Sequence, residues 1–334
     1  MTRDPARIDR RGFLLSAGGV AAAMAVDTGQ AMAQGNPAGA ASPAPVGPFP
    51  AGPQAYRVEV PKRPTWPDGA TTVFCVTVHI DGPGWSTGRG FPPLGSAGNG
   101  SYSVRRGMRR ALDLLERHGI KATWMIPGYD ALVSPGIVSE VHRAGHELCG
   151  HGYYHMPGDG ATERLERAHA ILTDIAAGEP PVGWCNPGGS KLDTTLATLK
   201  RLGYRYDASE KDDDLPYLAT IDGTVRNDFL IIPNNTISID DIPQYEDGLQ
   251  TPDEVLRQWT QELEAIHATT GFVHLSYHTT MNGSGPSDRT AIVDTLIRHA
   301  KALPKIKFMR LRDLADFCLA HPARWRLDLG QNGA

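Results

Sequence analysis

The sequence is poor in cysteine and lacks the short motifs that identify several large enzyme classes. Its four cysteines are scattered, and no two form a Cys-x-x-Cys pair, which argues against a disulfide framework but leaves one or two disulfides open. It lacks the glycine spacings of phosphate-binding and dinucleotide-binding loops, the serine-hydrolase elbow and the His-Glu-x-x-His helix of zinc proteases. These absences exclude a P-loop enzyme, a Rossmann dehydrogenase and a serine hydrolase.

The chain also lacks a large charge excess of either sign. Its 334 residues include 33 Lys and Arg against 37 Asp and Glu, a net charge of -4. Nucleic-acid-binding domains usually carry a strongly basic surface, so we expect no nucleic-acid partner. The 40% hydrophobic and 21% charged residues are typical of a globular protein, and the length suits one large domain with appendages.

The amino terminus contains the pattern of an export signal. Arg10 and Arg11 precede a mildly apolar stretch that ends in Ala31-Met32-Ala33, and residues 1–33 resemble a twin-arginine signal peptide. The apolar segment is shorter than the roughly 20 residues that span a bilayer. We therefore expect cleavage after Ala33, no stable membrane insertion afterwards, and a periplasmic or secreted protein.

Composition divides the remaining chain into three parts. Residues 34–67 are rich in Pro, Gly and Ala, a composition typical of an extended linker. Residues 68–325 have the patterning of a folded domain, and residues 326–334 form a short tail. The sequence does not determine the oligomeric state.

The domain alternates apolar, β-branched runs with amphipathic segments. We predict strands over residues 71–80, 122–126, 147–150, 182–185, 204–207, 229–232, 272–277 and 307–309, and helices over residues 104–118, 135–144, 161–177, 191–202, 251–267, 287–302 and 311–319. Six or seven βα units in about 265 residues predict an α/β fold with a parallel sheet, closed as a barrel.

Chemically active side chains follow three of these strands. His79 and Asp81 end the first strand, His151 and His155 follow the third, and His278 follows a later one. Because the carboxyl ends of parallel strands open on one rim, we expect these residues to converge. Two imidazoles and a carboxylate make a divalent-metal site with positions left for water and substrate.

Five segments, taken together, resemble the polysaccharide deacetylase (NodB-homology, carbohydrate esterase 4-like) family. They are Val78–Pro83, His118–Thr123, Gly145–His155, Tyr206–Tyr217 and Leu275–His278. The resemblance covers about residues 70–320, in the order of the family. It implies a deformed (β/α)7 barrel of the NodB type and a hydrolase acting on carbon–nitrogen bonds other than peptide bonds.

The resemblance also assigns roles to individual residues. It implies that Asp81, His151 and His155 bind a divalent metal, usually zinc, that His278 is the general acid, and that Asp207 orients or tunes that histidine. Such a metal acidifies water and polarises an amide carbonyl, while an acid protonates the leaving amine. Trp184, Asn186 and Tyr153 are the candidate substrate contacts.

Two positions depart from the family pattern. The carboxylate that usually serves as base is replaced by His79, and the arginine that usually pairs with it is replaced by Cys185. Loss of both partners is coherent, because an arginine facing a histidine would be unpaired or repelled. We hypothesise that His79 either replaces the base or binds the metal as a fourth ligand.

The predicted substrate is an N-acetylated polysaccharide or cell-envelope glycan, which the enzyme would deacetylate. One alternative is a small cyclic amide or ureide, opened as by an allantoinase or imidase. A second is a non-catalytic glycan-binding descendant, consistent with the missing base and arginine. A third, a non-haem iron oxygenase using His79 and Asp81, is opposed by the alternation of strands and helices.

Overall fold

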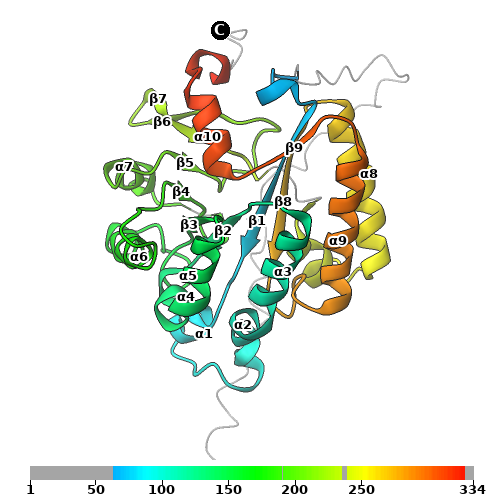
Figure 1. Ribbon diagram of the computed structural model, residues 1–334. Coiled ribbons are helices and arrows are strands. Elements are labelled where there is room, and N and C mark those ends of the chain that lie inside the picture. The colour runs from blue at the N-terminus through cyan, green and yellow to red at the C-terminus, as the bar shows by residue number, and fades with distance from the viewer. Residues whose placement is uncertain (1–62, 190, 235–238, 328–334) are drawn as a thin grey trace, which may run out of the picture. The chain divides into compact units, whose positions relative to one another are not determined.

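The computed structural model describes residues 63–189, 191–234 and 239–327 (Figure 1). The chain divides into a unit of residues 1–58 and a unit of residues 59–334, and every described residue belongs to the second. The predicted signal peptide, most of the predicted linker and most of the tail lie outside the described residues. Within the described part, no helix is both long and apolar enough to span a bilayer.

A nine-stranded sheet forms the centre of the domain. Strand β8 pairs along one edge of β1, while β9 and β2 share the other edge, and the sheet continues from β2 through β3, β4, β5 and β7 to β6. Every pairing is parallel except that of β6 with β7. The strands are β1 (Thr72–His79), β2 (Thr123–Ile126), β3 (Glu147–Gly150), β4 (Gly183–Trp184), β5 (Tyr206–Asp207), β6 (Tyr217–Ile221), β7 (Thr224–Ile231), β8 (Phe272–His278) and β9 (Ile306–Met309).

Helices follow most of the strands and lie around the outside of the sheet (Figure 1). This arrangement is the deformed α/β barrel that the sequence predicts, with an antiparallel hairpin at one edge. The helices are α1 (Gly84–Gly88), α2 (Asn99–Tyr102), α3 (Met108–His118), α4 (Gly128–Val133), α5 (Pro135–Arg143), α6 (Thr162–Ile175), α7 (Thr195–Arg201), α8 (Pro252–Ala268), α9 (Ser287–Ala302) and α10 (Leu311–Leu319).

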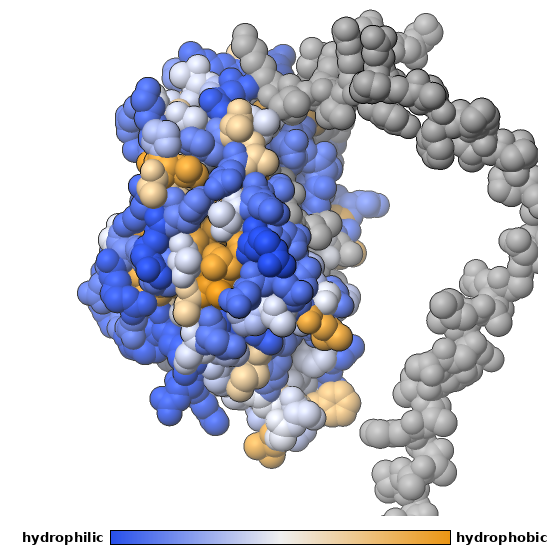
Figure 2. Space-filling model, turned by 90° about the vertical axis from the view of Figure 1, so that its right-hand side faces the viewer, coloured by the Kyte–Doolittle hydropathy of each residue, from blue (hydrophilic) through white to orange (hydrophobic). Residues whose placement is uncertain are grey.

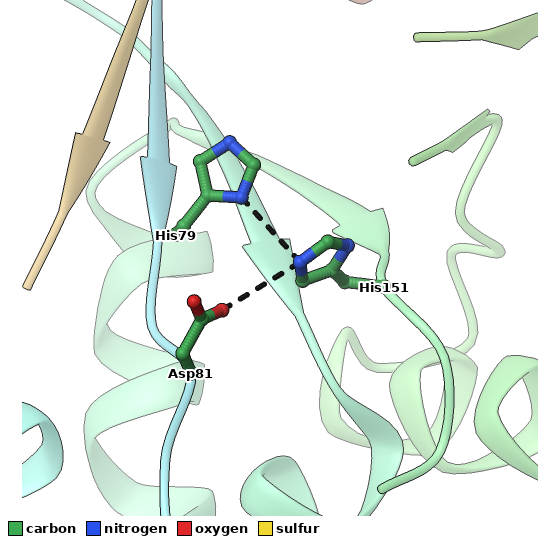
Figure 3. A group of neighbouring side chains, drawn as sticks. All are labelled: His79, Asp81 and His151. Carbon is green, nitrogen blue, oxygen red and sulfur yellow. Dashed lines mark hydrogen bonds and ion pairs between the residues drawn. The ribbon is translucent and has the colours of Figure 1, made fainter. Parts of the chain in front are cut away.

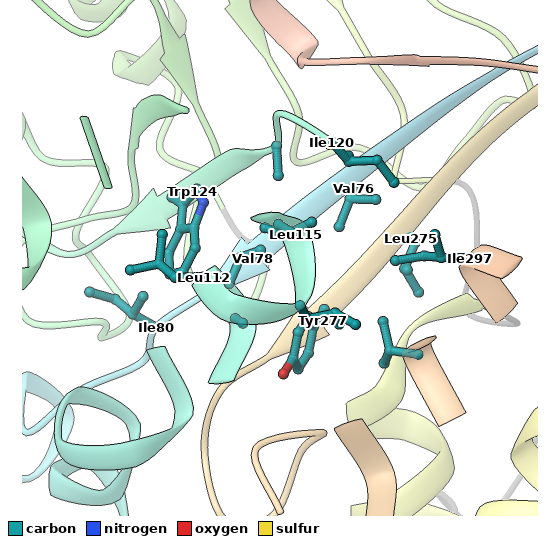
Figure 4. Close-up of a cluster of buried hydrophobic side chains, with 14 of the residues drawn as sticks. Val76, Val78, Ile80, Leu112, Leu115, Ile120, Trp124, Leu275, Tyr277 and Ile297 are labelled. Carbon is teal, nitrogen blue, oxygen red and sulfur yellow. The ribbon is translucent and has the colours of Figure 1, made fainter. Parts of the chain in front are cut away.

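Strand β1 supplies both layers of the core, and all eight of its residues are buried. Val76 and Val78 belong to the hydrophobic cluster that joins the sheet to α3, α5, α8 and α9 (Figure 4). Cys75 belongs to a second cluster, on the inner side of the sheet. Because successive residues of a strand point to opposite faces, Thr77 and His79 also face the inside of the barrel. The alternation of β1 therefore places His79 where the site is built.

The cysteines take part in this inner packing. All four are free and buried, and all four belong to the second hydrophobic cluster: Cys75, Cys149, Cys185 and Cys318. Burial raises the pKa of the Cys75 and Cys149 thiols well above the ordinary value. The structure therefore contains none of the one or two disulfides that the sequence left open, and the four cysteines pack as small apolar residues.

The hairpin of β6 and β7 differs from the predicted elements. The sequence analysis placed one strand at residues 229–232 and none between it and the strand at 204–207, whereas β7 begins at Thr224 and β6 precedes it. The turn between them is Asp222-Gly223, with φ angles of 50° and 70°. An Asp-Gly pair between β-branched residues is a strong hairpin signal, so the sequence did contain the information.

Tight backbone packing joins the segment before α3 to the chain just after β8. Residues Ser103–Gly107 form a π-helical turn that leads into α3. A Cβ built on Gly107 would lie 1.9 Å from the backbone oxygen of Thr279, so only glycine allows this approach. The contact fixes the position of the chain that follows His278.

Candidate metal centre and active site

Three strand ends meet at one pocket. Strand β1 carries His79 and leads into Asp81, β3 leads into His151 and His155, and β8 ends at His278. All five residues line a pocket of about 650 Å³. The structure therefore brings together the residues that the strand topology predicted to converge, as expected for the carboxyl ends of parallel strands.

Asp81 lies at the centre of this group. Its Oδ1 is 3.6 Å from His151 Nε2 and 3.3 Å from His155 Nε2, and its Oδ2 is 3.7 Å from His278 Nε2. Two ligands at about 2.0–2.2 Å from one ion lie at most about 4.4 Å apart. The distances from Asp81 to the two predicted histidine ligands are therefore compatible with a shared cation.

The donor atoms also fit a divalent cation chemically. His151 Nδ1 donates to the carbonyl oxygen of Cys185 at 2.6 Å, and His151 Nε2 faces His79 and Asp81 (Figure 3). Asp81 Oδ1 is buried and accepts no hydrogen bond from any described residue. A buried carboxylate oxygen without a donor is costly unless a cation meets it. One carboxylate and two imidazoles match the ligand types of catalytic zinc and related ions.

Electrostatics in the pocket favour positive charge. Burial raises the pKa of Asp81, but the neighbouring imidazoles, His155 foremost, lower it by more, and the result lies well below the ordinary value. Burial lowers the pKa of His151, but Asp81 and Cys185 raise it to about 10. Burial lowers the pKa of His155 to about 4. Asp81 is thus an anion at neutral pH, and a metal would compete with a proton for His151.

The loop that carries His155 is built around the buried carboxylate of Asp159. Its Oδ2 accepts the backbone N–H groups of Tyr153, Tyr154 and Met156 at 2.9, 2.9 and 3.1 Å. His155 has a φ of 61°, a left-handed conformation that costs free energy in a residue other than glycine. Asp159 therefore holds the loop in the conformation that turns His155 toward Asp81.

A second buried carboxylate, Asp130, holds the loop after β1. It accepts the backbone N–H groups of Gly82 and Gly84, both at 2.7 Å. Burial raises the pKa of Asp130 to about 7, although the two backbone hydrogen bonds lower it. Asp81 itself has a φ of 30°, so its orientation also depends on this support. The sequence analysis identified neither Asp130 nor Asp159.

The residue that orients His278 is Asp241, which corrects the prediction made for Asp207. Asp241 Oδ1 lies 2.5 Å from His278 Nδ1, and Asp241 Oδ2 accepts the backbone N–H of His278 at 2.9 Å. Asp240 is a more distant neighbour, 3.8 Å from Nδ1. Burial lowers the pKa of His278, but Asp241 raises it to about 9. The only sequence signal for Asp241 is the pair of adjacent carboxylates.

Asp207 has a different environment. Its fully buried carboxylate pairs with Lys191 Nζ at 2.5 Å and accepts a hydrogen bond from Ser209. Ser209 Oγ in turn accepts the backbone N–H of Asn186 at 2.8 Å. Asp207 therefore supports the loop after β4, and neither of these partners belongs to the metal centre.

The predicted substrate contacts separate into two kinds. Asn186 lines the pocket. Trp184 is 0% exposed and belongs to a hydrophobic cluster with Tyr204, while Tyr153 is 2% exposed and lies under the guanidinium of Arg167. Neither aromatic residue lines the pocket, so both predictions were wrong. Trp184 is a buried strand residue packed in the cluster with Tyr204, so it cannot reach the rim.

His79 lies inside the metal centre. Its Nδ1 is 3.4 Å from His151 Nε2 (Figure 3), and its ring stacks on that of His278 with centroids 4.3 Å apart. Potential ligand atoms of His79, Asp81 and His151 all lie within 4.8 Å of one another. The residue at the position of the usual base is therefore at ligand distance from the predicted metal ligands.

Comparisons with known proteins bear on the family and on the fold. The polysaccharide deacetylase family matches residues 99–206. The peptidoglycan deacetylase of Helicobacter pylori is 20% identical over 65% of this chain and 85% of its own length. A protein of Mycobacterium smegmatis assigned to the polysaccharide deacetylases shares 26% identity, with a TM-score of 0.69 over 78% of this chain and 94% of its own.

The same fold also occurs with another activity. The structure of Puue allantoinase has a TM-score of 0.68 and 23% identity, over 79% of this chain and 96% of its own. This likeness concerns the fold alone.

Polysaccharide deacetylases hydrolyse carbon–nitrogen bonds other than peptide bonds, and the matches to them confirm the predicted enzyme class. The motifs of this chain, its fold and these matches support its resemblance to the polysaccharide deacetylase (NodB-homology) family.

Proposed function

We propose that this protein is a zinc-dependent deacetylase that removes acetyl groups from an N-acetylated glycan of the cell envelope. The observation that carries the proposal is the position of Asp81, His151 and His155 opposite His278 in one pocket. When bound to these three ligands, a divalent ion would polarise the amide carbonyl and lower the pKa of the attacking water.

His278 has the geometry of a general acid. Asp241 occupies Nδ1 at 2.5 Å, which leaves the Nε2 proton directed toward Asp81 and the pocket. Amide hydrolysis requires a proton on the leaving nitrogen, and a positioned acid accelerates such a step by roughly 10²–10⁴-fold. We assign proton delivery to His278 and its orientation to Asp241.

The pocket suits a sugar more than an apolar ligand. Its wall includes neutral polar side chains that can exchange hydrogen bonds with hydroxyl groups, among them Ser86, Asn186, Ser209 and Asn234. Trp85 also lines the pocket and remains 45% exposed, so it offers an aromatic face for sugar stacking in place of the buried Trp184. The twin-arginine pattern supports a substrate outside the cytoplasm.

The test combines metal analysis with product analysis on the purified protein lacking residues 1–33. We expect close to one zinc per chain and acetate release from N-acetylglucosamine oligomers or peptidoglycan fragments. A chelator should abolish the release and zinc should restore it. Asp81→Asn should abolish activity, whereas Asp228→Asn, which changes a carboxylate that is 65% exposed and paired with Lys200, should leave it unchanged.

Two results would overturn the proposal. The first is a protein that binds no divalent metal under conditions in which it remains folded. The second is metal-dependent opening of a cyclic amide or ureide without acetate release from any glycan, which would assign the same centre to the alternative substrate class.

A further inference from the structure

We propose that His79 is itself a ligand of the metal, through Nδ1, so that the centre has four protein ligands: His79, Asp81, His151 and His155. This inference rests on the metal dependence proposed above and decides between the two roles that the sequence left open for His79. Its support comes from the contact of His79 Nε2 with Thr77 and from the distance between His79 Nδ1 and His151 Nε2.

His274 lies on β8, opposite Cys75 of the neighbouring strand β1. Its Nδ1 is 3.1 Å from the carbonyl oxygen of Pro233, and a carbonyl can only accept, so Nδ1 carries the proton. Burial lowers the pKa of His274 to about 4, so the ring is neutral and Nε2 is an acceptor. Nε2 lies 3.1 Å from Thr77 Oγ1, and the Thr77 hydroxyl can donate to it.

The direction of the Thr77 hydroxyl proton determines which nitrogen of His79 carries a hydrogen. The single hydroxyl proton of Thr77 has two near acceptors, His274 Nε2 and the carbonyl oxygen of Leu275, each at 3.1 Å. Toward His79 Nε2, at 3.4 Å, the Thr77 oxygen is therefore left to accept. A neutral imidazole has one N–H, and if it is on Nε2, the Nδ1 of His79 presents a lone pair.

The lone pair on His79 Nδ1 points toward His151. His79 Nδ1 faces His151 Nε2 at 3.4 Å, and His151 has already used its Nδ1 on the Cys185 carbonyl. His79 Nδ1 and His151 Nε2 therefore face each other beside the carboxylate of Asp81, where one cation could contact all three residues.

The distances match tetrahedral coordination. Ligands held at about 2.0–2.1 Å with tetrahedral angles lie about 3.3–3.4 Å from one another. Three of the separations among the four residues are 3.4 Å from His79 to His151, 3.6 Å from Asp81 to His151 and 3.3 Å from Asp81 to His155. Ligand atoms of His79, Asp81 and His151 all lie within 4.8 Å of one another, so His79 is as close to Asp81 and His151 as a shared ion requires.

The same geometry disfavours His79 as the base. A base must aim its lone pair at water in the open pocket, whereas His79 Nδ1 aims at another ligand nitrogen. One face of its ring is also covered by His278, with centroids 4.3 Å apart. The side chain is only 4% exposed.

The test measures metal binding directly. The apoprotein of the wild type, His79→Ala and His79→Asn is titrated with Co²⁺, whose visible absorption reports coordination number, and with zinc against a competing chelator. We expect His79→Ala to lower zinc affinity at least tenfold and to change the Co²⁺ spectrum. His79→Asn, whose side-chain oxygen can replace Nδ1, should recover part of the affinity. Circular dichroism of each apoprotein establishes that it is folded.

His278→Ala is the matched control, because it removes the neighbouring imidazole that we do not assign to the metal. It should lower acetate release while leaving zinc affinity and the Co²⁺ spectrum close to those of the wild type. If folded His79→Ala and His79→Asn both keep the wild-type affinity and spectrum, His79 is not a ligand. If the wild type itself binds no divalent metal, the proposed function fails instead, and the two failures are distinguishable.

Discussion

The role of Asp241 can be tested by the change of a single atom. In Asp241→Asn the side-chain oxygen can still accept the backbone N–H groups of His278 and Ser284, which are 2.9 and 2.7 Å from Oδ2 in the native protein. The new amide N–H₂ then faces His278 Nδ1, where the native carboxylate oxygen lies at 2.5 Å. The fold should therefore survive while the partner of the imidazole changes from acceptor to donor.

The size of the effect follows from this reversal. Asp241 raises the pKa of His278 against the opposite effect of burial, and the result is about 9. Without the carboxylate the pKa should return to 6.5 or below, so at most about a quarter of the molecules would be protonated at pH 7. A neutral ring that accepts at Nδ1 also cannot release its Nε2 proton without becoming an anion. We therefore expect kcat to fall by about 10²–10⁴-fold.

The assay is the pH profile of acetate release, with KM and zinc content measured in parallel. Asp240→Asn is the control, because Asp240 lies 3.8 Å from Nδ1 instead of 2.5 Å, and it should reduce kcat less than tenfold. The reasoning is refuted if zinc-loaded, folded Asp241→Asn retains more than a third of the native kcat. It is equally refuted if the two variants lose the same amount of activity.

Two further predictions concern stability. His146 Nδ1 accepts the backbone N–H of Ala122 at 3.0 Å, and burial lowers the pKa of His146 to about 4. The neutral ring therefore contributes up to about 3 kcal/mol to the free energy of unfolding above pH 6.5, and this contribution is lost as the pH falls toward 4. His146→Asn keeps an acceptor without titrating, so denaturant unfolding at several pH values should show a weaker loss of stability between pH 6.5 and 4.5, and an unchanged slope would contradict this. Gly107→Ala should destabilise by about 1–3 kcal/mol, because its Cβ would lie 1.9 Å from the Thr279 oxygen. Gly136→Ala, whose Cβ would meet nothing within 4 Å, should leave the melting temperature unchanged or higher, and equal losses in the two variants would show that the close approach is unimportant.

Sequence periodicity sufficed for the parts of the fold that repeat. The strand that ends at His79 is an unbroken apolar and β-branched run, and its burial on both faces in β1 is what such a run predicts. Once the strands are known to be parallel, the convergence of Asp81, His151 and His278 follows from topology. The meeting of these side chains in one pocket was therefore predictable without any knowledge of side-chain packing.

The parts that the sequence analysis missed depend on long-range packing. Asp241 reaches His278 because Asp240 forms a parallel bridge with Ser276, and no local pattern announces a bridge from an irregular segment. Trp184 was misplaced because a strand of two residues gives no periodicity from which to decide which face is inward. Asp207 was misassigned because the resemblance fixes the position of a residue but not its hydrogen-bond partner.

The buried carboxylates beneath the ligand loops have a consequence for how the enzyme acquires its ion. Asp130 and Asp159 fasten these loops through backbone hydrogen bonds, so the ordering of the ligands is completed during folding. Small zinc domains, in contrast, remain unfolded until the ion arrives. If the site binds a metal as proposed, the metal-free protein should remain folded, and adding the metal back should by itself restore activity.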